Sequence, residues 1–223
     1  MGRPDQPRDP RTGRWVKRPA AGLAAAALAV MLAHGPLGVT GGAVGGPAGS
    51  ASVESALGQA MRSKLVKSKR SARRGHQGTT WKRLGLKRKQ RRVERGLPCA
   101  ANSYGQVQRS FLRTPCRALD RMLVRLGDGN GTEIVVSVAW VEMRSTVAAL
   151  RLRELADTHG TGNVSPLPGA VVGSEPIRWT GHNYDSRRAR RTVVIAEVEP
   201  LRGSPTREYM DGIADVAVAF PRP

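Results

Sequence analysis

The charged residues of this chain are distributed very unevenly, which limits the part of it that can build a hydrophobic core. No Lys, Arg, Asp or Glu occurs from Pro19 to Val53, whereas residues 51–95 carry fifteen Lys or Arg and two acidic residues. Residues 99–223 are nearly balanced, with sixteen Arg against thirteen Asp or Glu. The net charge of +20 therefore belongs mainly to the first hundred residues. The remaining length suits one domain.

The chain is accordingly expected to have three parts. Residues 1–50 form an N-terminal signal peptide or signal anchor, residues 51–97 a basic low-complexity linker, and residues 98–223 an extracytoplasmic domain. Arg outnumbers Lys by 30 to 7 and Ala and Gly are abundant, which is typical of a bacterial genome of high GC content.

The first part resembles a secretory signal in its layout. Three basic residues precede the apolar run Ala20–Ala33, which suits the hydrophobic region of a signal better than a membrane span of about 20 residues. Small residues near Ala48 offer a cleavage position, so a secreted form and a membrane-anchored form facing outward both stay open. The first downstream base, Arg62, lies beyond the reach of the positive-inside rule counted from Ala33, which favours an external C-terminal domain. The alternative is a disordered leader on a cytoplasmic protein.

The second part is dense in positive charge and poor in large apolar residues, and Gly75, Gly78 and Gly85 would interrupt any helix in it. Such a segment cannot bury enough surface to fold alone, and we expect a disordered linker that adheres to polyanions. Outside the membrane the partner is an anionic lipid or an acidic envelope polymer, whereas in the cytoplasm it is RNA or DNA. The candidate polyanion-binding residues are Lys82, Arg83, Lys87, Arg88, Lys89, Arg91 and Arg92, joined by Arg187, Arg188, Arg190 and Arg191 from a predicted hairpin tip.

The two cysteines, Cys99 and Cys116, stand at the start of the predicted domain. In an exported protein such a pair forms a disulfide, and closing a loop of this length contributes roughly 3 kcal/mol. The alternatives are two buried thiols or a metal site. Zinc is disfavoured because no CxxC occurs and His159 and His182 are far apart in sequence, so no metal or other cofactor is expected.

The pattern of residues 98–223 predicts an α+β fold, in which helices pack on a small three- to four-stranded sheet in the order α-α-β-α-β-β-α. A fourth strand is placed within 164–172. The expected elements are a short helix around 104–111, a helix 114–126, a strand 133–143, a helix 145–158, a hairpin of strands 177–184 and 192–199 with its tip at 185–191, and a final helix opening at Ser204.

No catalytic motif accompanies the titratable residues of this domain. His182 and Tyr184 would share a strand face, with Glu197 across the hairpin, which is a pairing able to do acid–base work. A nucleophile motif is missing, so a non-catalytic binding or structural role is favoured and a secreted hydrolase is kept as an alternative. The full set of titratable candidates is Asp157, His159, His182, Asp185, Glu197 and Glu199.

Overall fold

The structure is a computed structural model that describes residues 48–223, with side chains from residue 58 onward. The predicted signal or anchor segment, residues 1–50, lies almost wholly outside the described residues. Among the helices within residues 48–223, none is both long enough and apolar enough to cross a bilayer.

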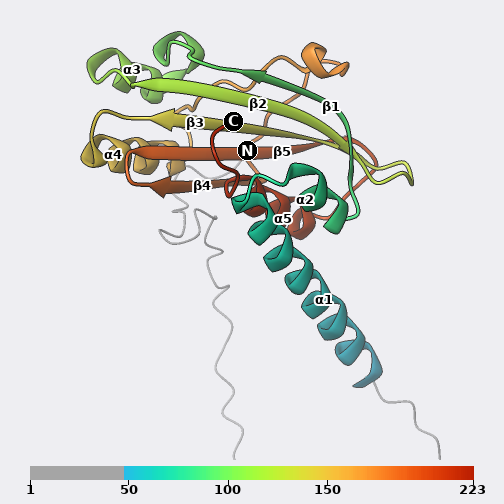
Figure 1. The fold of residues 1–223 in the computed structure, drawn as a ribbon. Helices are drawn as coiled ribbons and strands as arrows, with labels where there is room; N and C mark the ends of the chain where they lie inside the picture. The colour runs from blue at the N-terminus through green and yellow to red at the C-terminus, as the bar shows by residue number, and fades with distance from the viewer. Residues whose placement is uncertain (1–47) are drawn as a thin grey trace, which may run out of the picture.

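The described chain is an α+β domain built on one antiparallel five-stranded sheet, so the predicted fold class is confirmed (Figure 1). The sheet order is β1-β2-β3-β5-β4, with every neighbouring pair antiparallel. The elements are α1 (Ala48–Arg73), α2 (Gln77–Arg83), β1 (Lys87–Glu94), the 3₁₀ turn η1 (Ala100–Asn102), α3 (Gly105–Arg113), β2 (Ala118–Gly127), β3 (Glu133–Glu142), α4 (Thr146–Asp157), the 3₁₀ turn η2 (Gly169–Val172), β4 (Tyr184–Ala189), β5 (Thr192–Arg202) and α5 (Arg207–Ala217).

One face of the sheet is covered by α5, α2 and the C-terminal part of α1. Alternate residues of β2, β3 and β5 point to this face and pack against Ile213 and Phe220. Trp81 of α2 is 1% exposed, and its ring lies 5.2 Å from the ring of Phe220. Helix α1 then runs away from the sheet, on the side remote from β1 (Figure 1).

The opposite face is covered by α3 and α4 at one end and by the segment containing η2 at the other. Phe111 of α3 and Leu152 of α4 pack on Leu119, Val141 and Ile195 of the sheet. Helix α4 begins as predicted, because the Ser145 hydroxyl accepts a hydrogen bond from the Ala148 N–H at 3.1 Å. The strand predicted at 133–143 and the helices predicted at 145–158 and after Ser204 are likewise observed.

The helix predicted over residues 114–126 is wrong, since this segment is strand β2. Both faces of β2 are buried, so its apolar residues do not alternate with polar ones. Leu119, Met122, Leu123 and Leu126 happen to follow helical spacing, but neighbours on two sides hold the segment in the sheet.

The second part of the chain is not a disordered linker over its described residues. Strand β1, drawn from within 51–97, pairs with β2 along its whole length, and α2 packs under the sheet. The sheet therefore has five strands rather than three or four, and the extra strands are β1 and β2. The segment 164–172, expected to hide a strand, contributes a single bridge between Ser103 and Val164 and the turn η2.

The predicted hairpin is present and its second strand begins at Thr192 as predicted, but its first strand lies later in the chain than 177–184. Strand β4 covers residues placed at the predicted tip, and the turn contains only Arg190 and Arg191. Arg190 adopts a positive φ of 53°, a conformation that a tight turn demands. His182 precedes β4 and is exposed.

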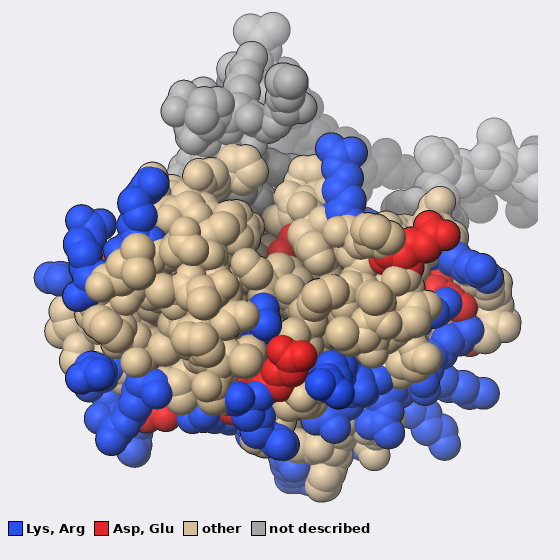
Figure 2. Space-filling view, turned by 90° about the horizontal axis from the view of Figure 1, so that it is seen from above, with Lys and Arg blue, Asp and Glu red and all other residues tan. Residues whose placement is uncertain are grey.

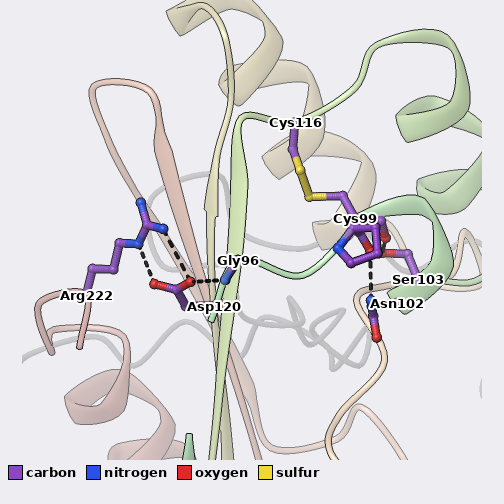
Figure 3. The surroundings of a disulfide bond; sticks show 8 residues. Gly96, Cys99, Asn102, Ser103, Cys116, Asp120 and Arg222 are labelled. Atoms are coloured by element: carbon purple, nitrogen blue, oxygen red, sulfur yellow. Dashed lines mark hydrogen bonds and ion pairs between the residues drawn. A yellow bond between two sulfur atoms is a disulfide. The ribbon is translucent and has the colours of Figure 1, made fainter. Parts of the chain in front are cut away.

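Cys99 and Cys116 lie at disulfide-bonding distance, with their Cα atoms 6.2 Å apart, as the sequence predicted (Figure 3). The bond joins the segment after β1 to the residue that leads into β2. The same segment is also fixed by the Gly96 N–H, which donates to the Asp120 carboxylate at 2.9 Å. Arg222 near the C-terminus donates to Asp120 as well, so three distant parts of the chain meet here.

Candidate anion-binding site

Strand β1 forms one edge of the sheet and presents five of the eleven predicted polyanion-binding residues to solvent. Its sequence is KRKQRRVE, and its first six residues are exposed. Viewed onto this edge of the molecule, Lys and Arg side chains gather along one margin, while uncharged residues fill the middle of the view (Figure 2). A charged edge strand is tolerated because its outer side needs no apolar partner.

Two of the β1 arginines meet a third at a pocket. Arg88 and Arg91 pair opposite Leu126 and Val124 of β2, and these two partners belong to the core face that packs against α2. Arg88 and Arg91 line a pocket of about 390 Å³ together with Arg95 and Gln77. The C-terminal residues 220–223 complete its wall. The irregularity in β1 between Arg88 and Gln90 allows both arginines to reach this face.

Asp and Glu side chains do not neutralise the arginines of β1 that line this pocket. Among the described residues, no Asp or Glu lies within salt-bridge distance of Arg88, Arg91 or Arg95. The Arg95 Nε donates to the backbone oxygen of Pro223 at 3.2 Å. Burial, and then the positive charges of Arg88 and Arg95, lower the pKa of Arg91. The fourth arginine of the lining, Arg222, is paired with Asp120 and Glu142. An anion entering the pocket would relieve the repulsion among these guanidinium groups.

Other members of the predicted set are already committed to contacts within the protein. Lys89 pairs with Glu133 at 2.5 Å, and Arg92 lies 3.8 Å from Glu94. Arg83 donates to the Lys67 carbonyl and to the Ser71 hydroxyl, which fixes α2 against α1. Lys82 and Lys87 are exposed and available to a ligand. Arg88 and Arg91, together with Lys82 and Lys87, are thus the members of this part of the set that remain available to a ligand. Arg95, which joins them in the pocket, was not among the predicted residues.

The four hairpin arginines lie on another edge of the sheet and do not form one cluster. Arg187 is half-buried, and its Nε donates to the Val218 carbonyl at the end of α5. Burial, followed by the charge of Arg73, lowers its pKa. Arg188, Arg190 and Arg191 are exposed around the turn. Arg187 is therefore a residue that stabilises a helix end, and the sequence could not reveal this because its register in β4 was misplaced.

Some of the titratable candidates meet at a second pocket, of about 270 Å³, on the other face of the sheet. His159, Tyr184 and Glu197 line it, together with Tyr104 and Trp179. The Tyr184 hydroxyl donates to Asp157 at 3.0 Å, so Asp157, which does not itself line the pocket, helps to fix the Tyr184 side chain. The sequence analysis did not single out Tyr104 or Trp179 as site residues.

The remaining titratable candidates serve other purposes. Glu199 accepts hydrogen bonds from the Thr180 N–H and hydroxyl, at 2.7 and 2.6 Å, and so holds the loop before β4. Asp185 is buried on the α5 side of the sheet, and His182 does not line the second pocket. His182, on which the hydrolase alternative was centred, lies outside β4 and outside the pocket that Glu197 lines, so the predicted shared strand face with Tyr184 is not formed. Within residues 58–223, no group of His, Cys, Asp and Glu is placed to hold a metal ion.

Comparison of the chain with protein-family models, with curated proteins and with solved structures found no match in any of the three.

Proposed function

We propose that the protein is a non-catalytic binding protein of the cell envelope, exported or membrane-anchored, that holds a linear polyanion along its β1 edge. The observation that carries the proposal is the pocket lined by Arg88, Arg91 and Arg95, none of which pairs with an Asp or Glu of the described residues. Guanidinium groups recognise phosphate and carboxylate oxygens by paired hydrogen bonds, which suits them to repeated anionic groups.

The shape of the domain indicates which anionic partner the basic edge meets. It favours a polymer of the envelope and disfavours the surface of the membrane that carries the protein. The charge-free segment that we propose as signal or anchor precedes α1 in sequence. Helix α1 has 26 residues, about 39 Å of helix, and leaves the sheet on the side remote from β1 (Figure 1). A membrane at the start of α1 would therefore leave the basic edge facing away from it, toward polymer in the surrounding envelope.

The proposal is tested by titrating the purified protein with inorganic polyphosphate at several salt concentrations. The test variant replaces Arg88, Arg91 and Arg95 by Gln. The control variant removes the same number of charges from α3 and α4, at Arg109, Arg113 and Arg151, which are exposed and form no ion pair within the described chain. Each lost phosphate contact lowers the slope of log affinity against log salt by about 0.7, so the test variant is expected to lose about 2 from this slope.

The expected result is binding at least tenfold weaker for the test variant and nearly unchanged for the control. Equal losses in both variants would mean that only net charge matters and would reject the proposed site. Parallel titrations with single-stranded RNA and with phosphatidylglycerol vesicles decide the class of partner. A clear preference for RNA would favour the cytoplasmic nucleic-acid alternative, and a preference for vesicles would contradict the orientation argued from α1.

A further inference from the structure

The second pocket is lined by three aromatic side chains, Tyr104, Trp179 and Tyr184. Eight aromatic residues occur in residues 58–223, and the other five are buried in the core or packed against it. Tyr184 is 4% exposed and also belongs to the core cluster under α3 and α4, and Trp179 packs against the cluster that contains Leu123. Tyr104 is 52% exposed, so the pocket gathers one exposed and two partly or fully buried rings.

The walls of this pocket are held by backbone contacts, so its shape is formed before a ligand binds. On one side, the Tyr104 N–H donates to the Asn163 carbonyl, and the Gln106 N–H donates to the Thr161 carbonyl. Gly162 has φ of +90°, and a Cβ there would lie 2.2 Å from the Tyr104 carbonyl oxygen, so only glycine permits this approach. On the other side, the Gly181 N–H donates to Glu197 at 2.5 Å.

The electrostatic character of the pocket is opposite to that of the rest of the chain. None of the Lys and Arg side chains within residues 58–223 lines this pocket, and His159 is its one basic residue. Glu197 is 9% exposed and lies in its wall. Burial raises the pKa of Tyr104, and the negative charge of Glu197 raises it further, so the field of this carboxylate extends to the pocket's half-exposed ring. The charge of Asp157, behind the pocket, is offset by Arg153 at 3.3 Å.

We propose that this pocket binds a small ligand through a positively charged nitrogen. Aromatic faces attract cations through their negative quadrupole, and a buried carboxylate beside them adds an attractive charge. The same features disfavour an anion, which would lose hydration and meet Glu197. The charged nitrogen could belong to a quaternary ammonium head group or to a primary amine such as a lysine side chain. The site lies on the opposite face of the sheet from the basic pocket and does not depend on polyanion binding.

The test is a ligand-observed NMR titration of the full-length protein with four probes. Choline represents a quaternary ammonium and n-butylammonium a primary amine. The compound 3,3-dimethylbutan-1-ol has the shape of choline without the charge, and N-acetylglucosamine represents a neutral sugar. We expect one of the two ammonium probes to bind at least tenfold more tightly than dimethylbutanol, and the tighter of the two identifies the source of the nitrogen. Binding of both ammonium probes no tighter than that of dimethylbutanol, preferential binding of the sugar, or no binding at millimolar concentration would each overturn the proposal.

Two variants of Tyr104 test whether the ammonium probe binds in this pocket. Tyr104 is 52% exposed, so its side chain can be changed without opening the core. Tyr104→Phe keeps the aromatic face and should bind the ammonium probe within about twofold of the wild type, whereas Tyr104→Leu removes the face and should weaken binding about fivefold. Matching affinities for the Leu and Phe variants would contradict the cation–aromatic contact even if an ammonium ligand binds.

Discussion

At the scale of single residues, the buried carboxyl of Asp185 is expected to make the stability of the protein depend on pH. Asp185 lies on β4 and is 5% exposed, near Asp215 of α5. Asp215 is also paired with Lys69 of α1 at 2.5 Å. Burial, and then the negative charge of Asp215, raises the pKa of Asp185 to about 7. The sequence named Asp185 as a titratable candidate, but its burial depends on where β4 begins, which the sequence pattern placed incorrectly.

This raised pKa predicts that the protein becomes less stable as the pH rises toward neutrality. The folded state holds the proton up to about pH 7, whereas the unfolded chain releases it near the ordinary value of 3.8. Between these values the folded state binds more protons, so the free energy of unfolding falls as the pH rises and levels off above pH 7. Asp185→Asn removes this ionisation and should be more stable than the wild type at pH 8 by roughly 4 kcal/mol, with a smaller gain at pH 5.

Urea unfolding of both proteins at pH 5 and pH 8 measures this difference. The Asn side chain retains an oxygen for the Ser186 N–H, which Asp185 accepts at 2.7 Å, and its amide can donate to Asp215. Glu154→Gln, an exposed change on α4, serves as the control and should leave the pH dependence unaltered. An Asn variant with the wild-type pH dependence would show that Asp185 is already ionised at neutral pH.

At the scale of elements, the sequence predicted best those segments that carry a clear local signal. Helix α4 begins at a cap residue, and strand β3 contains a run of β-branched residues. Strand β2 is buried on both sides, as β3 is, but it lacks such a run and its leucines follow helical spacing, so it was predicted as a helix. The second pocket could not be predicted for a related reason, since Tyr104, Trp179 and Glu197 come from three separate segments.

The disulfide is the element-scale feature whose effect can be stated in advance. It closes a loop of 17 residues in sequence separation, and such a link contributes about 3 kcal/mol by limiting the unfolded chain. Replacing both Cys99 and Cys116 by Ser should therefore lower the free energy of unfolding by about that amount while leaving the fold in place. The Leu97 N–H bond to the Leu119 carbonyl, at 2.9 Å, still connects the two segments.

Denaturant unfolding with and without reductant checks this expectation. Reduced wild-type protein should match the double Ser variant, and oxidised wild-type protein should exceed both. If reductant leaves the wild-type midpoint unchanged, the two sulfurs are not bonded in the isolated protein, and the argument for an oxidising compartment loses its support.

At the scale of the whole molecule, the main lesson concerns where the folded domain begins. The density of charge in residues 51–97 predicted a linker, because such a segment cannot fold on its own. Strand β1 does not fold on its own, since its backbone pairs with β2 and its charged side chains remain in solvent. The local composition of this segment does not reveal its long-range pairing with β2. Helix α2 contacts the core through only a few residues, so its composition gives little indication of burial either.

The last prediction concerns the residue at which the folded domain begins, which the sequence pattern placed at 98. A chain beginning at residue 98 would lack Trp81, Leu84 and Leu86, each no more than 6% exposed, and would uncover Phe220 and the outer edge of β2. Burying three such side chains contributes roughly 5–9 kcal/mol, as much as the whole stability of many domains. The shorter chain should bind the dye ANS and lose its cooperative thermal transition, whereas a chain beginning at residue 58 should keep that transition and bind little dye. If the two chains melt cooperatively at the same temperature, α2 and β1 are not part of the stable core, and the basic pocket that they form with the C-terminal residues would not persist in solution.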